Sequence, residues 1–137
     1  MTSDWARDLT ERKKRELEEK RVQQEKDLSD RKLLTANAER MWDEVVKAMM
    51  EYVSEINSEM GSDYLTIEGS QHRYNLKTPQ VSYYSVDFTS QAWLLSAQGT
   101  TYKLAIIEGN GVVWQNTPFS NLSSQRVAQD IVARAFR

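Results

Sequence analysis

The side chain best suited to acid–base chemistry occurs once in this sequence, as His72 in the stretch SQHRYNLKT. Histidine changes its charge near neutral pH, so it can act as a general base or as a metal ligand. The alternative interpretation is a structural histidine at a strand edge, close to a loop. Zinc centres ordinarily use several His or Cys ligands, whereas this chain has one His and no Cys. The sequence therefore predicts no metal site and no cofactor.

Asp87 is the carboxylate that could work with this histidine. It lies between Val86 and Phe88, so if those two residues face a core, Asp87 points to the other side of a sheet. A carboxylate beside a histidine can orient the ring for proton transfer, but spacing along the chain does not establish that the two residues meet. The sequence contains no G-x-S-x-G or S-x-x-K motif for a serine nucleophile. We therefore assign no catalytic residues and favour a protein that is not an enzyme.

A small-ligand-binding domain or an enzyme is the alternative function. Its pocket would lie between a sheet and a helix over residues 37–60, with Trp42 and Met49 as apolar walls and His72 and Asp87 as polar groups. Large apolar side chains at helical spacing form plain core more often than they line a pocket. Aromatic residues in strands are likewise core and cross-strand pairs in most cases.

The composition of the 137-residue chain changes near residue 60. Residues 1–60 contain 27 charged side chains and no Gly or Pro, whereas residues 61–137 contain 11 charged side chains and every Gly and Pro of the chain. The first composition is typical of helix. The second is rich in Val, Ile, Thr, Tyr and Trp, which favour strands.

The elements that would position a site follow from the apolar spacing. From Asn37 to Met60 apolar residues recur every three or four positions, which predicts a helix that ends at Gly61. The last segment, SNLSSQRVAQDIVARAFR, has a serine cap and a second helical apolar face. Between them the period is near two, and we predict strands at 64–68, 73–77, 81–89, 91–97, 102–107 and 112–116.

These elements predict an α+β fold with two parts. A long N-terminal helix, either continuous or broken near residues 34–37, precedes an antiparallel sheet of five to six short strands. A C-terminal helix packs on one face of the sheet. We expect a charged helical arm at residues 1–36, hereafter the arm, and a compact α+β domain at residues 37–137.

The arm carries few apolar residues. The stretch ERKKRELEEKRVQQEKD has two, and such a segment is disordered, a free helix supported by ion pairs, or a helix covered by another chain. A two-stranded coiled coil is an option, although its heptad pattern is poor here. Isolated large apolar side chains on a charged helix are typical of partner contacts. The expected anchors are Trp5, Leu9, Leu17 and Leu28.

Charge and hydropathy restrict the partners. The net charge of −2 argues against general nucleic-acid binding, and the basic run RKKR is followed at once by three glutamates. Base stacking on strand aromatics remains a minor alternative. The sequence has no apolar run of 18 residues and no signal-peptide pattern, so we expect a cytoplasmic protein with no membrane contact. The predicted function is a non-enzymatic interaction or assembly module, a homo-oligomer or a protein bound to another protein through the arm.

Overall fold

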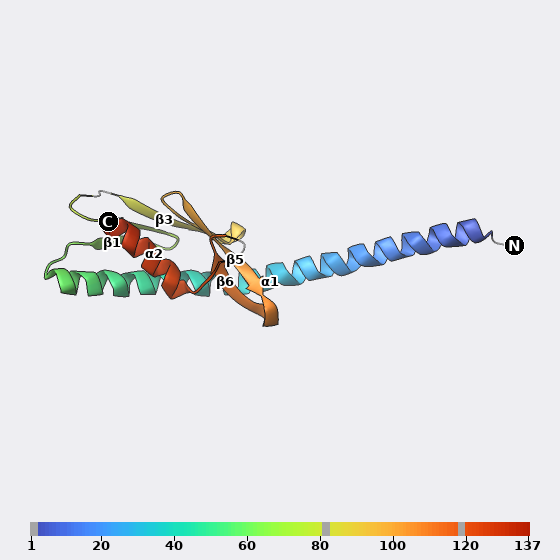
Figure 1. Cartoon of the computed structure of the whole chain (residues 1–137), viewed down its shortest axis with the longest axis horizontal. Helices are drawn as coiled ribbons and strands as arrows, with labels where there is room; N and C mark the ends of the chain where they lie inside the picture. Colours follow the sequence, from blue (N-terminus) through green and yellow to red (C-terminus); the bar gives the residue numbers. More distant parts are fainter. Residues whose placement is uncertain (1–2, 81–82, 118–119) are drawn as a thin grey trace. The chain divides into compact units, whose positions relative to one another are not determined.

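A computed structural model describes residues 3–80, 83–117 and 120–137 of the chain (Figure 1). The chain divides into two units, Met1–Leu33 and Leu34–Arg137. The helix α1 (Asp4–Met60) is continuous through residues 34–37, so the break that the sequence left open does not occur. The first unit therefore contains most of the arm, and the second contains the rest of α1, the sheet and the C-terminal helix α2 (Ser124–Phe136).

The C-terminal end of α1 follows the predicted glycine stop. Gly61 has φ +70°, its N–H donates to the Ser58 carbonyl at 3.3 Å, and the Ser62 N–H donates to the Asn57 carbonyl at 3.2 Å. This is the Schellman arrangement, which satisfies the last carbonyls of a helix. The Asn57 side chain also bonds both backbone groups of Leu65, at 2.7 Å and 2.8 Å. The chain is thereby directed from the helix into the sheet.

The described residues form an antiparallel sheet of seven strands, one more than the upper predicted number. Each strand pairs with the next in sequence, so the order in space is the order along the chain. The additional strand has only two residues, too few for any periodic signal to appear. The strands are β1 (Thr66–Ser70), β2 (Arg73–Lys77), β3 (Tyr84–Thr89), β4 (Leu94–Ala97), β5 (Thr100–Ile107), β6 (Gly111–Gln115) and β7 (Asn121–Leu122).

Three predicted strands start later than expected. The strand predicted at 64–68 is β1 at Thr66–Ser70. The predicted strand 91–97 was wrong over residues 91–93, because Ser90–Ala92 form a 3-10 turn and Trp93 has left-handed backbone angles with φ 52°. That turn redirects the chain between β3 and β4. Residues 81–82, at the start of the predicted strand 81–89, lie outside the described residues, and β3 is described from Tyr84.

The two faces of the sheet differ in polarity. Leu76, Val86, Leu95 and other apolar strand residues are buried on one face, together with the apolar residues of α1 and α2. α2 contacts β2 and β6, and the α1 residue Trp42 stacks on the β3 residue Phe88 with ring centroids 5.4 Å apart. Both helices therefore cover the same face, and α2 packs on the sheet as predicted. The α+β prediction is confirmed.

Candidate functional site

The predicted anchors of the arm lie on its surface. Trp5 is 74% exposed, and Leu9, Leu17 and Leu28 are each at least half exposed. Val22, which has a similar exposure, is a fifth large apolar residue of this surface. Large aliphatic and aromatic side chains gain about 1.5–3 kcal/mol each when they are fully removed from water. Burial of these side chains against a partner would therefore gain free energy that the first unit alone does not gain.

Ion pairs along the arm support its helical state. Arg21 donates hydrogen bonds to Glu18 and, at 2.7 Å, to Glu25, and Lys13 lies 3.9 Å from Glu16. The hydrogen bond from Arg21, together with its charge, lowers the pKa of the Glu18 carboxyl. Pairs one helical turn apart stabilise a helix by about 0.2–0.5 kcal/mol each. They favour the helix but bury no apolar surface.

His72 and Asp87 each have a charged partner that the sequence did not indicate. His72 lies in the turn between β1 and β2, and its Nε2 is 2.8 Å from Oε1 of Glu39 on α1. Asp87 accepts a 2.6 Å hydrogen bond from Nε of Arg73 on the neighbouring strand β2. The His72 ring also meets Phe88 edge-on. Among the described residues, no hydrogen bond joins His72 to Asp87.

A shallow depression brings these two residues to the same part of the surface. It has a volume of about 380 Å³ and is lined by residues 70–73 and 87–89, which include His72 and Asp87. In this depression His72 pairs with Glu39, and Asp87 pairs with Arg73. Because His72 is hydrogen-bonded to Glu39 and Asp87 to Arg73, the arrangement is that of two separate polar pairs on the surface. A proton-transfer role at this place stays a prediction.

Trp42 and Met49 are fully buried in the core cluster of the second unit. The Trp42 indole N–H donates to the Gln71 carbonyl at 2.7 Å, and its ring contacts Phe88 and Tyr74. These contacts place both residues within the packed layer between α1 and the sheet. A ligand pocket between sheet and helix stays a prediction, and these two side chains act as packing groups in the described state.

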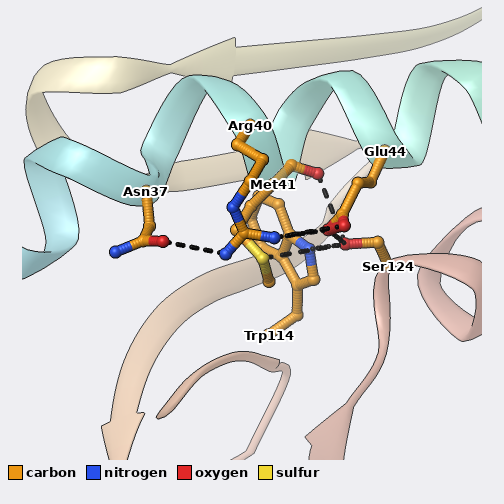
Figure 2. Close-up of polar contacts among 6 residues, drawn as sticks. All are labelled: Asn37, Arg40, Met41, Glu44, Trp114 and Ser124. Carbon is orange, nitrogen blue, oxygen red and sulfur yellow. Dashed lines mark hydrogen bonds and ion pairs between the residues drawn. The ribbon is translucent and has the colours of Figure 1, made fainter. Parts of the chain in front are cut away.

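A buried polar junction, which sequence reasoning missed, joins three elements of the second unit (Figure 2). Ser124, the first residue of α2, is 3% exposed. Its Oγ accepts a 3.1 Å hydrogen bond from Trp114 Nε1 on β6 and lies 3.2 Å from Glu44 Oε1 on α1. The carbonyl of Met41 is 3.4 Å away as a second acceptor. The hydroxyl thus connects α2, β6 and α1 at one point.

An exposed arginine holds the outer part of this junction. Arg40 donates to Asn37 Oδ1 at 2.8 Å and to both carboxylate oxygens of Glu44, at 3.3 Å and 3.2 Å. Figure 2 shows the Arg40 side chain between these two residues. Glu44 therefore reaches Ser124 with its charge balanced. The two serines at 123–124 predict a helix cap, and Ser123 does cap α2 by accepting a hydrogen bond from the Arg126 N–H. The buried hydrogen bonds of Ser124 have no periodic pattern in the sequence that could predict them.

We expect Ser124→Ala to lower the free energy of unfolding by about 1–3 kcal/mol, because the buried indole N–H of Trp114 loses its acceptor. Urea denaturation followed by circular dichroism measures the loss. Ser54→Ala is the matched control, since Ser54 is exposed on α1, and it should leave stability within about 0.5 kcal/mol. Equal stability of the two variants would contradict the role assigned to the Ser124 hydroxyl.

No protein-family model, no curated protein and no solved structure matches the chain. Within residues 3–80, 83–117 and 120–137, no group of three or more His, Asp or Glu side chains is arranged to hold a metal ion. In the same residues no helix is both long and apolar enough to cross a membrane.

Proposed function

We propose that this protein is a non-enzymatic interaction and assembly module, in which the arm joins two copies of the chain. The observation that supports the proposal most directly is the exposure of Trp5 at 74%, with Leu9, Leu17 and Leu28 exposed further along the same helix. Tryptophan is enriched among the residues that dominate binding free energy at interfaces. A large exposed indole gains free energy when a partner removes it from water, and this favours a protein surface as the partner of the arm.

The charge of the arm supports a second copy as that partner. Residues 1–33 contain ten Lys or Arg and nine Asp or Glu side chains. A nearly balanced segment does not repel a copy of itself through net charge, and it has no excess that would attract nucleic acid. We place the assembly in a reducing compartment such as the cytoplasm, which the absence of cysteine supports.

The second unit has the features of an independent body. Every residue of its buried core cluster lies between Ala38 and Ala135. Substitutions in the arm should therefore change assembly without unfolding the α+β domain. This separation allows assembly to be tested in the full-length chain.

The test is the solution mass of the full chain, measured by light scattering over a wide concentration range. We expect a dimer of about twice the 15.9 kDa chain mass, and a monomer when Trp5, Leu9, Leu17 and Leu28 are all changed to Ala. Ala preserves helix propensity, so a loss of dimer would reflect lost contacts.

The matched control changes exposed apolar residues of the second unit, Met50→Ala and Tyr83→Ala, and should remain dimeric. A full chain that is monomeric at every concentration would contradict the proposal. So would a dimer that survives the four arm substitutions.

A further inference from the structure

We propose that the two arms associate in antiparallel orientation, with the basic block of each chain beside the acidic block of the other. The basic block is Arg12, Lys13, Lys14 and Arg15, and the acidic block is Glu16, Glu18 and Glu19. The inference rests on the proposed function, because it specifies how the arm would meet a second copy. The blocks are adjacent in sequence and opposite in sign, and this order determines the orientation.

Symmetry reduces the choices to two. A closed dimer of identical chains has a two-fold axis. Two helices related by such an axis run either parallel in register, with each residue level with its own copy, or antiparallel. In the parallel pair the basic block lies against the basic block and the acidic block against the acidic block. Like charges at short range repel, so the parallel pair is opposed along both blocks.

In the antiparallel pair the basic block of each chain lies beside the acidic block of the other chain. When the two-fold axis passes between Arg15 and Glu16, residue numbers that lie level with each other add up to 31. Arg12 is then level with the partner's Glu19, and these two residues lie seven apart on one face of the helix, so both can face the other copy. This level occurs twice by symmetry, and around it each basic block lies beside the other chain's acidic block. Opposite charges at short range attract and also fix orientation.

Chain length is consistent with this alignment. Trp5 lies on the same helix face as Arg12 and is level with the partner's Lys26, whose aliphatic stem can cover an apolar side chain. The one level that brings like charges together, Asp4 with the partner's Asp27, lies at the end of the overlap. The described part of the overlap, residues 3–28, ends before Leu34, where the second unit begins.

The charged blocks are available for such contacts. All ten residues from Glu11 to Lys20 are exposed. Within the chain Lys13 lies 3.9 Å from Glu16, and Glu18 accepts hydrogen bonds from Arg21, all between exposed side chains. Water competes with exposed ion pairs, so their exchange for pairs with the partner chain has little cost.

Distances between spin labels test the orientation. The chain has no cysteine, so Ser29→Cys and Thr10→Cys each create one attachment site in the full-length protein, at exposed positions. In the antiparallel pair the two Ser29 sites are 27 residues apart along the axis, which is about 40 Å, and the two Thr10 sites are about 16 Å apart. In the parallel pair both distances fall to the helix separation of about 8–10 Å.

Double electron–electron resonance on the dimer should give the long distance at Ser29 and the short one at Thr10. Short distances at both sites would overturn the antiparallel orientation and leave the assembly function intact. A chain that is monomeric at every concentration in the light-scattering measurement would overturn the assembly function itself.

A charge-reversal variant gives a second readout. Changing Glu16, Glu18 and Glu19 together to Lys places like charges level in the antiparallel pair, so we expect the dimer dissociation constant to rise at least about tenfold at low salt. The difference from the unchanged chain should shrink at high salt, because ions screen exposed charges. The variant also raises the net positive charge of each arm, so the rise supports the antiparallel pair together with the spin-label distances, whereas an unchanged dissociation constant would overturn the proposal.

Discussion

Trp42→Ala should lower the free energy of unfolding by about 3–5 kcal/mol, the range for loss of a large aromatic core residue. Trp42 is fully buried, stacks on Phe88 with an interplanar angle of 9°, and contacts Tyr74 at 6.0 Å between ring centroids. The substitution also leaves the Gln71 carbonyl without its indole donor. Domains of this size have a total stability of about 5–15 kcal/mol, so the variant should be partly unfolded under mild conditions.

Urea denaturation followed by circular dichroism measures this loss, and Trp5→Ala is the control in the same helix. Trp5 is 74% exposed, so its substitution should leave the unfolding free energy of the second unit unchanged within about 0.5 kcal/mol. Trp42→Phe keeps an aromatic ring but removes the N–H, so its loss should fall between the two. Equal losses for Trp42→Ala and Trp5→Ala would contradict the assignment of Trp42 to the core.

Gly69→Ala is expected to disrupt the edge of the sheet. Gly69 lies on β1 opposite Tyr74 and has φ +152°, a conformation that residues with a side chain rarely adopt. An added Cβ would lie 2.2 Å from the Arg73 carbonyl oxygen and 2.7 Å from the Tyr74 Cα, and neither backbone atom can move aside like a flexible side chain. Backbone strain costs about 1–3 kcal/mol, and overpacking costs a similar amount.

Hydrogen exchange of the β1 and β2 amides, together with urea denaturation, measures this effect. Gly99→Ala is the control because Gly99 also has positive φ, +88°, but no atom lies within 4 Å of its added Cβ. The control isolates backbone strain, so Gly69→Ala should lose more stability than Gly99→Ala. Equal losses would show that β1 can move away from β2 without cost.

Much of the fold could be predicted because its signals are local. The apolar spacing over residues 37–60 and the glycine at position 61 are consequences of helix geometry, and the helix ends where they indicate. The strand β2 has the predicted bounds, and the turn at Gly109–Gly111 joins β5 to β6 as a hairpin. Period, propensity and turn chemistry depend on neighbours within a few residues, so one sequence is enough to read them.

Other features of the fold required contacts between distant residues. The turn at Ser90–Ala92 interrupts a segment with a strand-like composition, and Trp93 takes left-handed angles there, with its carbonyl accepting from the Leu104 N–H. Tertiary hydrogen bonds overrode local preference at this point. The strand β7 is so short that only its pairing with β6 defines it.

The candidate sites show the same division. The composition of the arm and its isolated apolar residues are properties of the sequence, and a helix of that composition leaves Trp5 exposed. The partners of His72 and Asp87 could not be predicted from the sequence, because Glu39 is 33 residues from His72 and Arg73 is 14 residues from Asp87. The junction at Ser124 joins residues separated by as many as 83 positions. Local periodicity therefore determined the elements and the arm, whereas packing of α1 and α2 on one sheet face decided which side chains meet, because contacts across such separations have no local signal.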